Sequence, residues 1–282
     1  MTTNENEFQV VLPSNVKCET ERRNRTNHFT TCLPHPIDVK KEDWEVALMQ
    51  INYPHSWHNV TPAACVITFG HHKHRAIQDK QKNLIPSRHY ESPHEILKTI
   101  DSLKPQWFSG IFRVNEWSKR SEIILDPNNE FSMSRDLSAL LGFGSKQTFH
   151  NPQRDSAAIK THTPSAILAE DYDEKHRMVF AAKFGADMRA TMYDMFIYSN
   201  IVETSLVGNA YVPLLRFVAV DSSHGSYISK LYENPYYLKL QSGFIQEIEI
   251  KICDEEGNLV KFEWGKIVIV LKFRRKNKFG YQ

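Results

Sequence analysis

The sequence predicts an all-β protein, a single jelly-roll antiparallel β-sandwich with a small helix-hairpin-helix α/β insertion. Three observations favour this fold class. From residue 177 onward, apolar and polar side chains alternate in one strand-like run after another. Turn-forming residues separate these runs. Few of the runs have a helix between them, which disfavours a parallel α/β sheet and favours an antiparallel sandwich or jelly roll.

The first part of the chain contains four predicted strands. They cover residues 8–12, 29–33, 44–51 and 65–69. In the third, Trp44, Val46 and Leu48 fall on one face, so this strand turns one side toward the core. The histidine-rich run at residues 70–75 follows the fourth strand and is predicted to be an exposed turn.

The period changes to a helical one between about residues 87 and 145. Ser92-Pro-His-Glu95 is a capping box with proline at the first helical position, and it predicts a helix of about three turns. Two short strand runs follow at 111–114 and 122–125. Ser134 is the expected N-cap of a second short helix, and Gly142 its left-handed stop.

Strand patterning returns after a polar stretch and continues to the C-terminal tail. The predicted strands cover residues 178–184, 192–200, 211–220, 236–240, 245–253, 259–264 and 266–273. The clearest has Ile248, Ile250 and Ile252 on one face and charged side chains on the other. The turn at residues 254–258 joins it to the next strand as a hairpin.

These patterns predict a discontinuous domain with one insertion. We expect residues 1–86 and 176–275 to form the jelly roll, and residues 87–145 an inserted α/β module. Residues 146–175 are expected to form a long surface excursion, and a loop of that length usually has a function. Residues 276–282 form a basic tail.

Charge and composition limit the function classes. Of the 282 residues, 41% are hydrophobic and 24% charged, a composition typical of a folded soluble protein. The 35 Lys and Arg nearly balance the 33 Asp and Glu, so any binding of nucleic acid has to be local. No apolar run reaches the length of a membrane span. The polar, acidic N-terminus does not resemble a secretory signal, so we expect synthesis in the cytoplasm or nucleus without secretion.

Four cysteines are spread over the chain without a C-x-x-C pair. They are Cys18, Cys32, Cys65 and Cys253. This spacing indicates neither a zinc site nor a redox dithiol. We therefore expect reduced, structural thiols.

The sequence motifs of common enzyme classes are missing, and we expect no catalytic activity. There is no G-x-S-x-G elbow, Walker loop, dinucleotide fingerprint or H-E-x-x-H helix. Asp221-Ser-Ser-His224 places the residue types of a triad side by side, but a triad is assembled from separate elements. This segment is expected to be a polar turn.

Histidine pairs offer a metal-site hypothesis that the neighbouring charges oppose. His71 with His74, or His55 with His58, would each need a third ligand. Lys73 beside the first pair would repel a cation. We therefore expect no metal and no cofactor.

A cluster of bases near the C-terminus is the candidate nucleic-acid contact. It comprises Lys272, Arg274, Arg275, Lys276 and Lys278. Such a cluster can bind phosphates even when the whole chain is nearly neutral. The alternative is a cationic strand end that protects a sheet edge from aggregation.

Several segments, in order along the chain, resemble one protein family. The longest is Tyr198-Ser-Asn-Ile-Val-Glu-Thr-Ser-Leu-Val-Gly-Asn-Ala-Tyr-Val-Pro-Leu-Leu-Arg216. The others are residues 29–39, 44–60, 90–97, 137–143, 234–238 and 248–273. Together they resemble the minor capsid, or penton, proteins of Polinton (Maverick) elements and of related adintoviruses and virophages. Residues 144–175 depart from the family.

The resemblance implies a structural capsid protein of a DNA virus or element. Its single jelly roll would form homopentamers at the vertices of an icosahedral shell, beside a double-jelly-roll major capsid protein, and its location would be the virion capsid. We expect the subunit contact near five residues: Tyr53, Trp57, Asn200, Glu203 and Arg216. The basic tail would face packaged DNA.

Other functions remain open at this point. They are a major capsid protein, a trimeric receptor-binding β module, a host-domesticated binding protein, and a hydrolase on a jelly-roll scaffold. The mass of the particle distinguishes a pentamer from a trimer. An activity screen distinguishes the hydrolase.

Overall fold

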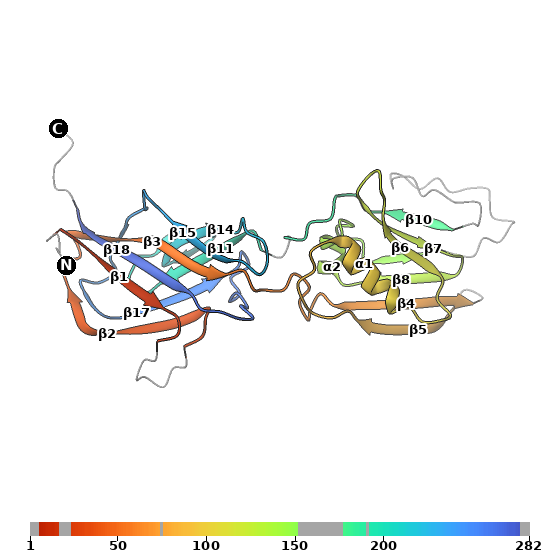
Figure 1. Cartoon of the computed structure of the whole chain (residues 1–282), viewed down its shortest axis with the longest axis horizontal. Helices are drawn as coiled ribbons and strands as arrows, with labels where there is room; N and C mark the ends of the chain where they lie inside the picture. Colours follow the sequence, from red (N-terminus) through yellow and green to blue (C-terminus); the bar gives the residue numbers. More distant parts are fainter. Residues whose placement is uncertain (1–5, 17–23, 74–75, 152–176, 190–191, 277–282) are drawn as a thin grey trace. The chain divides into compact units, whose positions relative to one another are not determined.

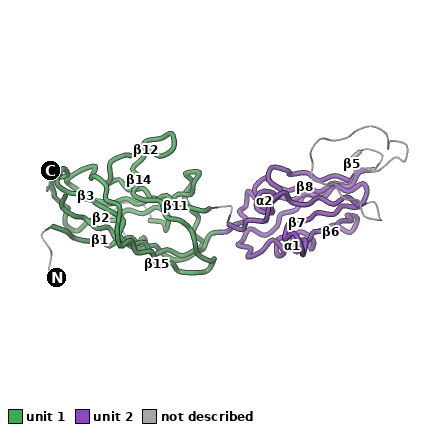
Figure 2. Tube along the Cα trace, turned by 90° about the horizontal axis from the view of Figure 1, so that it is seen from above, with its two compact units in different colours: residues 1–57, 192–282 green, residues 58–191 purple. Residues whose placement is uncertain are grey.

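The computed structural model divides the chain into two compact units (Figure 2). Unit 1 comprises residues 1–57 and 192–282, and unit 2 comprises residues 58–191. The structure describes residues 6–16, 24–73, 76–151, 177–189 and 192–276. Each unit has its own hydrophobic core.

Two large antiparallel sheets form most of the described part of unit 1 (Figure 1). The first has the order β1 (Glu7–Pro13), β18 (Val268–Arg275), β3 (Trp44–Pro54) and β15 (Tyr227–Leu231), and β16 (Leu238–Lys239) also pairs with β3. The second has the order β14 (Leu214–Ala219), β11 (Asp194–Ser199), β17 (Phe244–Cys253) and β2 (His28–Asp38).

The pairing of these strands is nested, which defines a jelly roll. Taken in chain order, the first strand pairs with the last, β1 with β18, and the second with the second last, β2 with β17. The same holds for β3 with β15 and, at the centre, for β11 with β14. Eight strands in two sheets with this order are the jelly-roll arrangement, so the predicted fold class is confirmed.

Alternation between residues 248 and 252 of β17 supplies one side of the core of unit 1. Ile248, Ile250 and Ile252 are fully buried, while of the two residues between them Glu249 is half-buried and Lys251 is exposed. Burying an isoleucine stabilises the fold by about 1.5–3 kcal/mol. Val46 and Leu48 of β3 belong to the same core, as predicted from their shared face.

The described part of unit 2 is a second β structure with two helices. One sheet has the order β5 (Ala76–Leu84), β4 (Val66–Lys73), β8 (Asn129–Met133) and β9 (Thr148–His150). The other has the order β10 (Met178–Ala181), β7 (Ser121–Leu125) and β6 (Gly110–Val114). The helices are α1 (Pro93–Ser102) and α2 (Arg135–Leu140).

Both helices begin where the capping residues predict, and α2 also ends where predicted. The Ser92 hydroxyl accepts a hydrogen bond from the Glu95 N–H, and the Ser134 hydroxyl accepts one from the Leu137 N–H. After α2, Gly142 has a φ of +88°, the left-handed conformation that ends a helix. An added Cβ at Gly142 would clash with the carbonyl oxygen of Phe184.

The boundaries of the insertion differ from the expected ones. The inserted unit spans residues 58–191, because β4 and β5 pair with β8, and β10 pairs with β7. The expected module at 87–145 is therefore only the middle of a larger, mostly β unit. Of the expected excursion at 146–175, the structure describes residues 146–151, where β9 lies, and the rest is outside the described residues.

Some predicted elements were wrong, and some strands of the structure were not predicted. Residues 70–73 continue strand β4 and are not a turn. Residues 259–264 form no strand, only an isolated bridge between Leu259 and Cys253. The polar edge strand β5 was missed because it shows no apolar alternation.

The cysteines differ from expectation at one position. Cys65 and Cys253 are free and buried. Cys32 is disulfide-bonded, so the expectation of a reduced thiol is wrong there. No helix in the described part of the chain is both long enough and apolar enough for a membrane span.

Candidate functional site

The two aromatic residues expected near a subunit contact lie inside unit 1. Tyr53 and Trp57 are both buried, and their rings stack with a centroid distance of 6.4 Å. Phe262 contacts Trp57 edge-on at 5.7 Å. These side chains support the roll from within and are not available to a neighbouring subunit.

The three polar residues of that prediction make contacts within unit 1. The Asn200 side chain donates to the Glu247 carbonyl and accepts from the Glu249 N–H, so it joins the end of β11 to β17. Glu203 pairs with Lys41 at 3.5 Å. The Arg216 guanidinium lies over the Tyr232 ring at 3.6 Å. Each of the three polar residues is therefore held by a partner within unit 1.

Most cations of the basic cluster already face counter-charges or acceptors. Lys272 pairs with Glu7 at 2.8 Å, and the Arg274 Nε donates to Glu45 at 2.6 Å. Arg274 also lies 3.4 Å above the Tyr237 ring.

The remaining bases of the cluster differ in their environment. Lys276 donates to the Glu42 carbonyl, and Arg275 is exposed. Lys278 is outside the described residues. A phosphate that binds here has to compete with the carboxylates of Glu7 and Glu45.

His55, which directly follows strand β3, is buried. The sequence did not identify it as a group with a shifted pKa. His55 Nδ1 lies 3.0 Å from the Ser222 carbonyl, and its ring stacks on Trp57 at 4.0 Å. His224 meets it edge-on at 5.8 Å. Burial, followed by the charge of His224, lowers the pKa of His55 to about 4. The ring is therefore neutral at pH 7.

A second histidine pair lies in unit 2 around one carboxylate. His72 Nε2 is 3.1 Å from Glu130 Oε2, and the rings of His72 and His150 are 4.3 Å apart. Burial, then the charge of His72, lowers the pKa of His150. No three potential metal ligands converge among the described residues. His74, one of the histidines considered for a metal, is outside that part of the chain.

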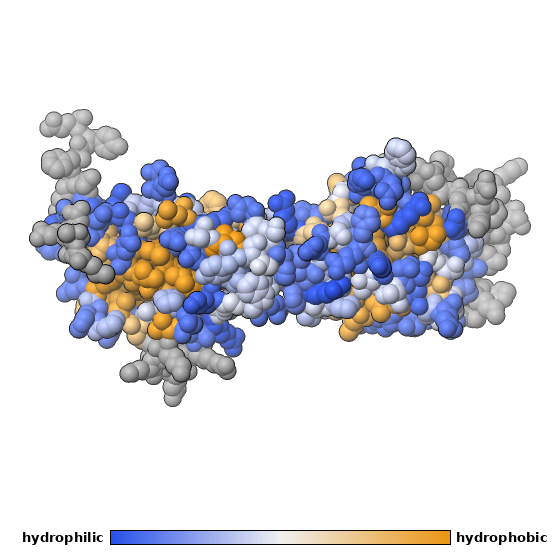
Figure 3. Space-filling model, viewed as in Figure 1, coloured by the Kyte–Doolittle hydropathy of each residue, from blue (hydrophilic) through white to orange (hydrophobic). Residues whose placement is uncertain are grey.

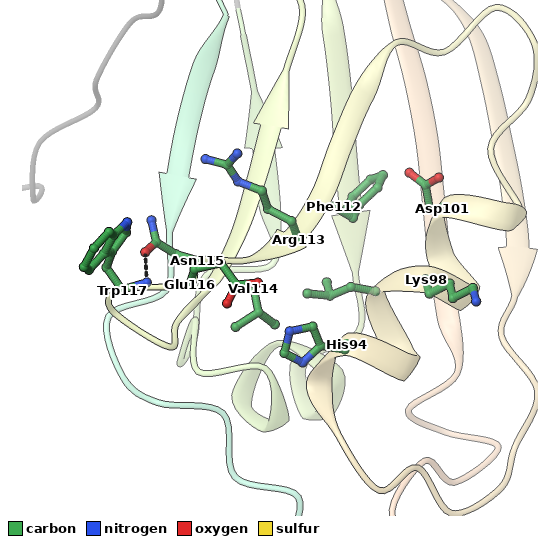
Figure 4. Close-up of a pocket in the computed structure, with 10 residues that line it drawn as sticks. His94, Lys98, Asp101, Phe112, Arg113, Val114, Asn115, Glu116 and Trp117 are labelled. Carbon is green, nitrogen blue, oxygen red and sulfur yellow. Dashed lines mark hydrogen bonds between the residues drawn. The ribbon is translucent and has the colours of Figure 1, made fainter.

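An open groove of about 620 Å³ lies between α1 and the β6–β7 hairpin of unit 2 (Figure 4). Its helix side carries Lys98 and Asp101, and Trp117 stands at the hairpin end. Asp101 pairs with Lys104 at 2.7 Å. Asn115 accepts from the backbone N–H of Trp117, which fixes the hairpin turn. Asp101 and Asn115 are thus held by partners within unit 2.

Both sheets of unit 1 carry ion pairs on their outer faces. On β17, the outward residues Glu249 and Lys251 pair with each other at 3.4 Å, and His28 of β2 binds Glu249 at 2.6 Å. The outer face of the β1–β18–β3–β15 sheet carries the ion pairs of Lys272 with Glu7 and of Arg274 with Glu45, but it also has a large apolar area (Figure 3). A charged face suits contact with water, whereas a large apolar patch marks an interaction surface.

A short hairpin projects from unit 1 beside β14 (Figure 2). Its strands are β12 (Ser205–Val207) and β13 (Ala210–Val212), which pair only with each other among the described strands. Leu206 and Tyr211 are cross-strand partners, with exposed fractions of 63% and 75%. The sequence resemblance covers this segment, but its alternation alone did not indicate a separate hairpin.

Solved structures resemble nearly the whole length of the chain. No protein-family model and no curated protein matches it. Among solved structures, it is similar to the mavirus penton protein, with a TM-score of 0.49 and 12% identity over 96% of this chain and 99% of that chain. It is also similar to a chain of the Sputnik virophage, with a TM-score of 0.47 and 9% identity over 98% and 99%. At these identities and TM-scores, the likeness by itself assigns no function.

Proposed function

We propose that the chain is a structural capsid protein that forms the pentameric vertex of an icosahedral shell. The observation that carries the proposal is where the penton-like segments lie. Residues 44–60 include β3, residues 198–216 join β11 to β14, and residues 248–273 include most of β17 and β18. Segments far apart in the sequence thus meet in the two sheets of one jelly roll, a fold of many viral capsid proteins.

The surface chemistry of unit 1 supports assembly over catalysis. An apolar sheet face and a projecting apolar hairpin offer contacts for other protein chains. The role proposed is that of a structural subunit of the capsid, and no catalytic function is proposed. Its partners would be four further copies and a double-jelly-roll major capsid protein.

The solution mass of the full chain tests this proposal. Light scattering over a range of protein and salt concentrations should give a species of five times the 32.8 kDa chain. A trimer at every concentration would favour a receptor-binding module. A chain that stays monomeric throughout would contradict the proposed vertex.

We further propose that the basic tail contacts packaged DNA on the inside of the shell. Arg274 and Arg275 are both exposed, so a phosphate can reach Arg275 directly and Arg274 in competition with Glu45. A variant with Arg274, Arg275 and Lys276 changed to Gln should keep its fold and bind DNA less tightly. Its affinity should also depend less steeply on salt. In a plot of the logarithm of the binding constant against the logarithm of the salt concentration, the slope should become shallower by roughly 0.9 for each phosphate that the variant no longer binds.

A charge-matched variant controls for net charge. Lys80, Lys82 and Lys98 are exposed lysines of unit 2. Changing these three lysines to Gln removes as many positive charges as the tail variant does, and it should leave DNA affinity and packaging unchanged. If both variants bind DNA alike, the tail protects a sheet edge and has no contact with DNA.

A further inference from the structure

The β12–β13 hairpin is built as a projecting contact. No charged residue occurs between Thr204 and Pro213, and the turn uses Gly208 at a φ of +60°. None of its six strand residues is buried. A two-stranded hairpin alone in water is marginally stable, and this one exposes a leucine and a tyrosine side by side. The low stability of an isolated hairpin and its exposed apolar side chains both indicate that another surface covers the hairpin in the assembled state.

The outer face of the β1–β18–β3–β15 sheet has the matching chemistry. Eight outward residues form two rows across the four strands: Val11, Val270, Gln50 and Leu231 in one, and Pro13, Val268, Asn52 and Ser229 in the other. None of the eight is charged. Charged outward residues, such as Lys272 and Arg274, lie toward the opposite end of these strands. Val11 has an exposed fraction of 57%, so the apolar part of the face is accessible.

The polar groups on this face bind one another. The Gln50 amide donates to Asn52 at 3.0 Å and to Ser229 at 3.1 Å. The Gln9 amide donates to the Met49 sulfur at 3.3 Å. Because these donors already have partners, less hydration is lost when an apolar surface covers them. The face is therefore suited to a protein partner.

We infer that the hairpin of one copy of the chain packs Leu206 and Tyr211 onto this sheet face of the next copy. The hairpin emerges from the β11–β14 connection of one sheet, and the receiving face belongs to the other sheet. The hairpin and the eight-residue part of the sheet face both lack charge, and every chain carries one of each. A contact between two different surfaces is heterologous, and its repetition closes into a ring when the rotation allows it. The inference therefore deepens the proposed function, on which it rests, by naming the contact that builds the ring.

Two variants remove the two sides of the contact. Changing Leu206 and Tyr211 to Ser should shift the association midpoint to a concentration higher by at least about tenfold, as expected when interface anchors are truncated. Changing Val11 and Val270 to Lys should have the same effect. Leu84→Ser is the matched control, because Leu84 of unit 2 is equally exposed at 62%. The control should assemble like the native chain. The circular dichroism spectra of all variants should match that of the native chain, as expected when the fold is retained.

Mixing the two variants gives the sharpest result. Each variant keeps one intact surface, so the mixture should form heterodimers that cannot grow into rings. Mass photometry distinguishes these dimers from the monomers of each variant alone. A hairpin variant that still forms rings, or a mixture that stays monomeric, would overturn the inference. Rings in the hairpin variant would leave the proposed vertex intact, whereas a native chain that never associates would overturn both.

Discussion

Acidification should destabilise unit 1 through His55. Its pKa of about 4 in the folded chain lies below the ordinary value of about 6.5 for histidine. The unfolded chain therefore binds this proton more tightly, and the free energy of unfolding falls as the pH drops below about 6.5. The loss levels off below about pH 4. Each pKa unit corresponds to about 1.4 kcal/mol, so the loss between pH 7 and pH 5 is about 2 kcal/mol.

The assay has to report on unit 1 alone, because the two units have separate cores. Hydrogen exchange over a urea series, measured on peptides from β17, gives the free energy of unfolding of unit 1 at each pH. His55→Gln removes the titrating group. We expect this variant to be less stable at pH 7, because the ring that stacks on Trp57 is removed, but to lose about 2 kcal/mol less than the native chain between pH 7 and pH 5.

The control for this experiment is His35→Gln, at an exposed position of the same unit. It should reproduce the pH dependence of the native chain. Equal losses of stability for the native chain and His55→Gln would refute the assignment. The pH dependence would then originate from other groups of unit 1.

Two further predictions concern stability and use the same assay. Gly142→Ala should destabilise unit 2 by about 3 kcal/mol, because it adds a clash with the Phe184 carbonyl to the cost of a positive φ. Gly257→Ala, at a φ of +84° with no described atom within 4 Å of the new Cβ, should cost unit 1 only about 1 kcal/mol, and equal losses would refute the clash. Ile250→Ala should cost unit 1 about 2–5 kcal/mol, whereas Phe244→Ala, at an exposed position of the same strand, should cost far less; similar costs would contradict the assigned register.

Elements with a strong local signal could be predicted from the sequence. The alternation of Ile248, Ile250 and Ile252 specifies a strand with one buried face, and a serine before each helix specifies where it begins. Strand β5 carries exposed Lys80 and Lys82 at the edge of a sheet, so it has no apolar period to detect. The size of unit 2 was missed partly for this reason, and partly because the predicted strands at 65–69 and 178–184 were assigned to the jelly roll, whereas their pairing places them in unit 2.

Contacts that depend on strand register could not be predicted. Glu7 and Glu45 are distant in sequence from the basic cluster, and only the pairing of β1, β18 and β3 brings them to Lys272 and Arg274. The aromatics near the end of β3 were assigned to a subunit contact, yet the alternation of that strand buries Tyr53. No sequence pattern specifies the distance between His55 and His224, so the lowered pKa could not be predicted either.

The symmetry of the assembled particle tests the central claim most directly. Electron micrographs of the purified full chain, sorted into class averages, should contain rings with five-fold rotational symmetry in which unit 1 forms the closed ring. Class averages with three-fold symmetry, or single molecules at every concentration, would contradict the proposed capsid vertex.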